Sequence, residues 1–175
     1  DMEALGYYVI VATAGHDTTS ASTAGGLLAL MQNPEQMNKL RNDTSLLPHA
    51  IEEMFRWETP VKHFLRTATE DYTLRGRSIK EGDRLMMMYA SGNRDEEVFN
   101  NPFEFQVDRR PNKQIAFGYG VHRCLGHLLA KMEMSAFYKA LLERTTDIQL
   151  NGDPAWIHAT FVSGLKRLPV RFIAR

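Results

Sequence analysis

Cysteine is nearly absent from this sequence, because among 175 residues only Cys124 carries a thiol. A single cysteine cannot form an internal disulfide, so we expect a cytoplasmic protein rather than a secreted scaffold. Net charge is absent as well: 21 basic residues balance 21 acidic ones, which argues against nucleic acid as the main partner. No apolar run reaches membrane-spanning length and no signal peptide is evident, so no membrane partner is expected.

The remaining composition is that of an ordinary globular chain. Hydrophobic residues make up 43% of it, which is enough for one core. Long stretches of helical period and short stretches of alternating residues predict a mainly α protein with small β-sheets, an α+β fold. Residues 1–5 already resemble a helix interior with no capping residue ahead of them, so we expect this chain to be part of a longer one.

A long helix is predicted over residues 2–32. Its apolar positions recur at helical spacing and small residues fill much of the rest, which predicts a largely buried helix. The helix centre, residues 14–19, holds a glycine and two adjacent threonines, all poor helix formers. Threonine hydroxyls can bond back to helix carbonyls, so we expect a local widening there. The apolar positions are Leu5, Tyr8, Val9, Ala12, Leu27 and Leu30.

Two shorter helices are predicted after Asn33 and after Pro48, followed by short strands between Val61 and Asp83. The second of these helices carries Glu53 and Arg56, which are neighbours on a helix surface because they are three residues apart. Taken alone, such a pair is typical of a solvated ion pair of small value.

Residues 117–126, called the Cys loop below, deliver the only cysteine to the start of a helix predicted from Cys124 to Arg144. Two glycines one residue apart allow the backbone to adopt positive φ angles and to approach a flat ligand closely. A thiolate at a helix start is stabilised there and can ligate haem iron. The alternatives are a buried structural cysteine and a zinc site from His122, Cys124 and His127, which lacks a second cysteine. The helix has an apolar stripe: Leu125, Leu128, Leu129, Met132, Ala136, Phe137 and Leu141.

The run Phe-Gly-x-Gly-x-His-x-Cys-x-Gly in the Cys loop resembles the haem-binding signature of cytochrome P450 monooxygenases. The resemblance implies that residues 1–175 are the C-terminal portion of a single haem-thiolate monooxygenase domain, in which the long central helix and the Cys-loop helix sandwich haem b. It implies Cys124 as the axial ligand of the iron. The other implied cofactor contacts are Ala14, Gly15, Arg66, Phe117, Gly118, Gly120, His122 and Gly126.

Two further motifs carry the resemblance. Residues 14–19 resemble the family's oxygen-activating helix motif, which implies that Thr18 hydrogen-bonds bound dioxygen while Asp17 helps to supply protons. Glu53 and Arg56 match the family's Glu-x-x-Arg signature, with Arg109 or, as the second choice, Arg110 as a later partner. A buried Glu53–Arg56–Arg109 group would have to be mutually satisfied and would hold the Cys loop in register.

The resemblance also implies a chemistry, namely insertion of one atom of O2 into a small hydrophobic substrate, with bacterial terpene-alcohol hydroxylases as the nearest type. No nucleotide-binding fingerprint is present, so electrons are expected from an iron–sulfur ferredoxin with a separate reductase. Arg123, His127 and Lys131 could offer that acidic partner a positive patch. The protein is expected to be a monomer. Residues expected to face the substrate are Ala12, Ala14, Val61, Phe64, Leu65, Phe161 and Val162.

One departure from the family pattern and two alternative functions accompany this interpretation. Gln114 stands where many bacterial members have a histidine, which would weaken one haem propionate contact. A haem-thiolate peroxygenase would keep Cys124 but would not need the proton relay of Asp17 and Thr18. A chain of only 175 residues could also be an inert, haem-free fragment or an interaction module.

Overall fold

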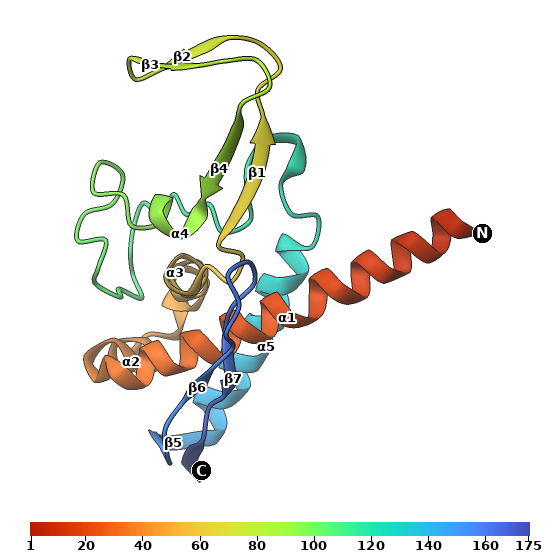
Figure 1. The fold of residues 1–175 in the computed structure, drawn as a ribbon. Helices are drawn as coiled ribbons and strands as arrows, with labels where there is room; N and C mark the ends of the chain where they lie inside the picture. Colours follow the sequence, from red (N-terminus) through yellow and green to blue (C-terminus); the bar gives the residue numbers. More distant parts are fainter.

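The computed structural model describes residues 1–175 and confirms a mainly α fold with small sheets (Figure 1). The helices are α1 (Met2–Gln32), α2 (Pro34–Asn42), α3 (Leu47–Glu58), α4 (Tyr89–Gly92) and α5 (His127–Arg144), with short 3-10 turns at Thr44–Leu46 and Gly120–His122. The strands are β1 (His63–Thr67), β2 (Tyr72–Leu74), β3 (Arg77–Ile79), β4 (Arg84–Met88), β5 (Thr145–Leu150), β6 (Ala155–Trp156), β7 (Leu165–Arg167) and β8 (Val170–Ala174).

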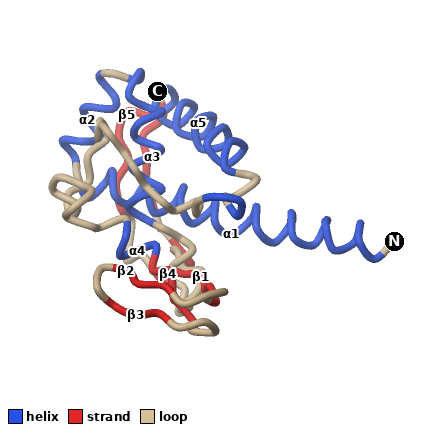
Figure 2. Tube along the Cα trace, turned by 90° about the horizontal axis from the view of Figure 1, so that it is seen from above, coloured by secondary structure: helices blue, strands red, loops and turns tan.

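Helix α1 has the predicted bounds, but the prediction that it is largely buried is wrong for its first half. Burial begins only at Ala21, and residues 2–17 are exposed. Figures 1 and 2 show why: this half projects from the body of the molecule, and no other element packs against it. The helix start also differs from expectation, because the side chain of Asp1 caps it by accepting a hydrogen bond from the Glu3 N–H. No helix is long and apolar enough to cross a bilayer.

The predicted widening of α1 is absent, since residues 14–19 continue as an unbroken α-helix. The threonines bond back to the helix as expected: the Thr18 hydroxyl donates to the Ala14 carbonyl at 2.9 Å. The Thr13 and Thr23 hydroxyls donate to carbonyls four residues earlier in the same way. These bonds are therefore accommodated within regular helical geometry.

Helix α1 and helix α3 pack closely because two glycines in α1 leave room. A Cβ at Gly25 would overlap Oε2 of Glu58, and one at Gly26 would lie 2.7 Å from Cγ of Met54. A side chain at either position would overlap the side chains of Glu58 or Met54, which fill this space. The contact continues into a core formed by the second half of α1 with α2, α3, α5 and the loop before the Cys loop. Its fully buried members include Leu30, Leu40, Ile51, Met54, Val107, Met134 and Tyr138.

Helix α5 differs from prediction in two ways. It begins at His127, three residues after Cys124, because residues 120–126 form a 3-10 turn and a bend instead. The face that packs into the core carries Met134, Tyr138 and Leu142, whereas most of the predicted apolar stripe is exposed. The helix is apolar on both faces, so its periodicity could not indicate which face packs here. The exposed stripe members are Leu125, Leu128, Leu129, Met132, Ala136 and Phe137.

Four antiparallel two-stranded sheets complete the fold: β1 with β4, β2 with β3, β5 with β8, and β6 with β7. The β1–β4 pair has His63 opposite Met88 and Thr67 opposite Arg84, and it carries the β2–β3 hairpin away from the helices (Figure 1). An isolated bridge joins Val61 to Val162. Two chain segments a hundred residues apart thereby meet next to β1.

Candidate functional site

A buried charge network occupies the junction between α3 and the loop that follows α4. Glu53 and Arg56 are both fully buried, and Arg109 is 6% exposed. Nε and Nη2 of Arg56 each donate to the Glu53 carboxylate at 2.7 Å, and Nε of Arg109 donates to it at 3.0 Å. The Gln106 N–H and the Asn112 amide complete the set of donors to this carboxylate. These contacts satisfy the carboxylate fully, as a buried charge requires.

The two guanidinium groups of this Glu53 network reach outward to loop carbonyls. Arg56 donates to the carbonyls of Asn93, Pro102 and Glu104, and Arg109 donates to those of residues 100, 101 and 104. The network therefore fixes the irregular segment between α4 and the Cys loop by its backbone. Arg110, the alternative third member, is exposed.

The Cys loop presents its thiol to the outside. The backbone N–H of Cys124 donates to the Phe117 carbonyl at 2.9 Å, which closes the loop on itself. Gly118 and Gly120 both have φ of 71°, the left-handed region that a side chain disfavours. The Cys124 side chain is free and exposed, and its carbonyl lies 2.9 Å from Nδ1 of His127.

Packing and polar contacts hold the two ends of the Cys loop. The Phe117 ring lies 4.5 Å from that of Phe55 in α3, centroid to centroid, and 6.0 Å from that of His127. Gln114 donates to the Glu52 carboxylate, which also pairs with Lys131 in α5. Lys131 is thus engaged in an ion pair, so the predicted positive patch loses one of its three members to α3.

The predicted oxygen-side residues lie together on the exposed half of α1. Thr18 is half-buried, and Ala14 and Gly15 are exposed one turn earlier. The Asp17 carboxylate lies 2.8 Å from Nδ1 of the exposed His16. In Figures 1 and 2 the segment that leads into α5 runs beside the middle of α1, so the Cys loop and these residues belong to the same region of the fold.

Part of the set predicted to face the substrate forms one group next to β1, namely Val61, Phe64, Phe161 and Val162, whereas Ala12 and Ala14 lie on the exposed half of α1. Val61 is bridged to Val162, and the ring of Phe64 lies 5.3 Å from that of Phe161 in an edge-on arrangement. Leu65 is exposed on β1, and Ala12 is exposed on α1. The two predicted propionate partners, Arg66 and His122, are both exposed, and no hydrogen bond joins them to each other.

The end of α3 carries charges that do not pair with one another. Arg94 donates to the carbonyls of Arg56 and Trp57 and stacks 4.4 Å from the Trp57 ring centre, and Lys62 donates to the carbonyl of Glu58. These cations cap the negative end of the helix. Burial is the main cause that lowers the pKa of Arg94 to about 10 and also lowers the pKa of Lys62. The Glu58 carboxylate, 7% exposed, has no hydrogen-bond partner at Oε1, and burial raises its pKa.

Glu58 should therefore weaken the fold as the pH rises. A carboxyl with a raised pKa binds its proton more tightly in the folded chain, so stability is lost as the pH climbs above the unfolded value of 4.5. We expect Glu58→Gln to raise the melting temperature at pH 8 by about 2–4 °C, the shift that 1 kcal/mol produces in a chain of this size, with no gain at pH 4. Thermal unfolding monitored by circular dichroism measures the melting temperature at each pH. The exposed Glu143 supplies the control, Glu143→Gln, and an equal gain from both variants would contradict the assignment.

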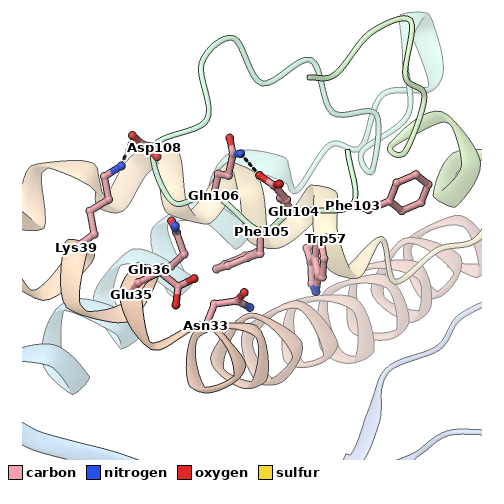
Figure 3. Close-up of a pocket in the computed structure, with 10 residues that line it drawn as sticks. All are labelled: Asn33, Glu35, Gln36, Lys39, Trp57, Phe103, Glu104, Phe105, Gln106 and Asp108. Carbon is pink, nitrogen blue, oxygen red and sulfur yellow. Dashed lines mark hydrogen bonds and ion pairs between the residues drawn. The ribbon is translucent and has the colours of Figure 1, made fainter. Parts of the chain in front are cut away.

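One cavity borders the predicted oxygen-side residues, and a second lies away from the site. One, of about 540 Å³, lies between α1 and α5 and is lined by Gly15, Thr19 and Phe137 among others. The other, of about 470 Å³, lies between α2 and the loop 103–108 and contains none of the predicted site residues (Figure 3). Lys39 and Asp108 form an ion pair at its rim. No group of three or more His, Cys, Asp or Glu side chains is arranged to hold a metal ion, which disfavours the zinc alternative.

Sequence reasoning missed several buried polar residues around the network. Asn93 is fully buried between α3 and the Cys loop. Arg94, which is half-buried, caps the end of α3, and Glu58 is buried there. Asn93 follows a short helix and precedes a charged run, which is typical of an exposed turn. The sequence gives no periodic signal that would distinguish it from one.

Comparisons with known proteins agree with this arrangement. The family model for cytochrome P450 matches residues 2–153. The chain is 49% identical over 166 residues to cytochrome P450-terp of a Pseudomonas species and 41% identical over 167 residues to the steroid C26-monooxygenase of Mycobacterium tuberculosis. These matches cover 95% and 94% of this chain but only 39% and 45% of the two relatives, respectively.

Structural similarity points the same way. The crystal structure of CYP108D1 from Novosphingobium aromaticivorans matches with a TM-score of 0.91 and 46% identity, over 97% of this chain and 41% of that one. The predicted resemblance is thereby confirmed at the level of family and fold. The chain belongs to the cytochrome P450 family.

Proposed function

We propose that this protein is a haem-thiolate monooxygenase that inserts one oxygen atom from O2 into a small hydrophobic substrate. The observation that carries the proposal is the Cys loop: one free, exposed thiol on a loop closed by the Cys124 to Phe117 hydrogen bond. When bound through a thiolate, haem b supplies O2 activation, because the ligand pushes electron density that favours O–O cleavage.

The donor set of this region fits haem. A Cβ at Gly15, Gly120 or Gly126 would meet nothing within 4 Å, so the backbone at these positions is open to a flat group. Cys124 would ligate the iron, while Arg66 and His122 would bind the propionates. A guanidinium suits that task because its planar donors match a carboxylate. Gln114 is already bonded to Glu52, so we assign it no propionate contact.

We further propose that the chain is the C-terminal portion of a single haem-thiolate monooxygenase domain. Two apolar faces support this: the first half of α1 and the outward stripe of α5 both expose large hydrophobic side chains. Contiguous exposed apolar side chains are typical of surfaces that another part of a protein covers. The chain also spans less than half the length of its relatives.

The substrate and the electron donor are proposed by chemical class. The cluster of Val61, Phe64, Phe161 and Val162 is apolar, which suits a small hydrophobic compound such as a terpenoid. We propose a ferredoxin with a separate reductase as the electron source, with Arg123 and His127 remaining as its positive contacts, and a monomeric enzyme in the reducing cytoplasm.

Within this function the Thr18 hydroxyl would hold and order a proton on the oxygen side of the site, and Asp17 would supply protons to it. We expect Thr18→Ala to bind haem and substrate normally, because the side chain makes no hydrogen bond outside its own helix. Reductant consumption should stay close to the parent rate, while hydrogen peroxide replaces most of the hydroxylated product. Parallel assays of reductant, product and peroxide in the reconstituted system measure this.

Thr19→Ala is the matched control, because Thr19 is the adjacent threonine and is not assigned to the oxygen side. It should couple electrons to product as the parent does. A product-to-peroxide ratio unchanged in Thr18→Ala would remove the oxygen-activating role of α1. If peroxide alone supported full turnover in both, the peroxygenase alternative would be favoured.

A further inference from the structure

We propose that Asn93 is a positioning residue that fixes the Cys loop through the segment that leads into it. The inference deepens the proposed function and rests on it for its meaning in catalysis. Asn93 directly follows α4 and is 0% exposed. Its N–H donates to the Tyr89 carbonyl at 2.9 Å, which ends the short helix.

All polar groups of Asn93 are used, and they connect two separate parts of the site. Its carbonyl accepts from Nη1 of Arg56 and its Nδ2 donates to the Thr59 hydroxyl, each at 2.8 Å. Its Oδ1 accepts from the backbone N–H of Ile115, also at 2.8 Å. One side chain therefore ties the end of α3 to the segment that enters the Cys loop.

The contact with Ile115 continues toward the thiol through backbone hydrogen bonds. The Ile115 carbonyl accepts from the Gly118 N–H at 2.8 Å, which forms the turn at the start of the loop. The Phe117 carbonyl, inside that turn, accepts from the Cys124 N–H at 2.9 Å. The position of Ile115 thus sets the position of the turn, and the turn carries the acceptor that orients Cys124.

Steric contact reinforces the hydrogen bond. A Cβ at Gly92 would lie 2.7 Å from Cδ1 of Ile115, so the backbone before Asn93 packs directly on the Ile115 side chain. Ile115 is held at its N–H by Asn93 and at its side chain by Gly92. Such double contact leaves it a single position.

The Glu53 network does not provide this attachment itself. Its members bond backbone or side-chain atoms of residues 93–112, and none of them bonds residues 113–126. Gln114 makes the other side-chain hydrogen bond to this segment, but it is only half-buried and its partner Glu52 is shared with Lys131. Asn93 is the fully buried link between the network and the Cys loop.

Amide hydrogen exchange on the 175-residue chain without haem tests this link. Asn93→Leu keeps the approximate volume and removes the acceptor for Ile115, so we expect roughly tenfold faster exchange at the Ile115 and Gly118 amides. Thr59→Val is the matched control, because it removes the partner of Nδ2 but leaves the acceptor for Ile115. Parent-like exchange in Asn93→Leu, or equal acceleration in Thr59→Val, would overturn the proposal.

The parent chain gives a second measurement should Asn93→Leu fail to fold. The Ile115 amide should then exchange at least about tenfold more slowly than that of the exposed Lys113, and a smaller ratio would overturn the proposal. In chains loaded with haem, Asn93→Leu should lose part of the thiolate-type Soret band of the reduced carbonyl complex, while Thr59→Val keeps it. If the parent chain lacks that band while exchange at Ile115 still depends on Asn93, only the haem assignment is refuted. If the parent chain shows the band while exchange at Ile115 does not depend on Asn93, only the role of Asn93 is refuted.

Discussion

Glu53→Ala should remove a large part of the free energy of unfolding of this chain. The substitution removes the shared acceptor of two buried guanidinium groups, which are left unpaired with their positive charges facing each other. Breaking a buried ion pair in this way costs about 3–5 kcal/mol. That is a large part of the 5–15 kcal/mol by which typical domains are stable. Denaturant unfolding at pH 7, followed by far-ultraviolet circular dichroism, measures the loss.

Glu52→Ala provides the matched control one residue away. Glu52 is half-exposed and pairs with Lys131 and Gln114 at the surface of α3. Loss of an exposed pair costs about 0–1 kcal/mol, so this variant should fold almost as the parent does. Equal, small effects of the two substitutions would show that the Glu53 network contributes no more than a surface pair.

The family and its main elements could be predicted because their signals are local. The period of α1, the proline at the start of α2 and the Cys-loop signature each lie within a few tens of residues. The burial of Glu53 and Arg56 is harder to predict, because a spacing of three residues looks the same on a solvated helix. What separates the two cases is burial by the loop around residues 93–112, which only tertiary structure supplies.

The two wrong predictions about helix burial, in α1 and in α5, have a common physical origin. Periodicity shows that a helix has an apolar face, but not whether this chain covers it, and α5 has two such faces. For the same reason the first half of α1 was expected to be buried.

Asn93 was missed for a different reason, because hydrogen bonds to backbone groups leave no mark on residue spacing. Local helix starts also shift by a turn when a 3-10 segment intervenes, as before His127.

Cys124→Ala should abolish the thiolate character of the haem site while leaving the fold intact. The side chain is exposed and makes no hydrogen bond, and its removal leaves the Cys124 N–H contact with Phe117 in place. Substitutions at such exposed positions usually change stability by less than about 0.5 kcal/mol. The chain holds no other thiol that could replace the ligand. Val121→Ala, in the same loop at a 97% exposed position, is the matched control and should behave as the parent.

The absorption spectrum of the reduced carbon-monoxide complex tests the central claim most directly. It is recorded for the parent, Cys124→Ala and Val121→Ala after loading with haem, at equal haem content. We predict the far-red-shifted Soret band of a thiolate-ligated haem in the parent and in Val121→Ala, and complete loss of that band in Cys124→Ala. Retention of the band in Cys124→Ala would contradict the assignment of Cys124 as the axial ligand.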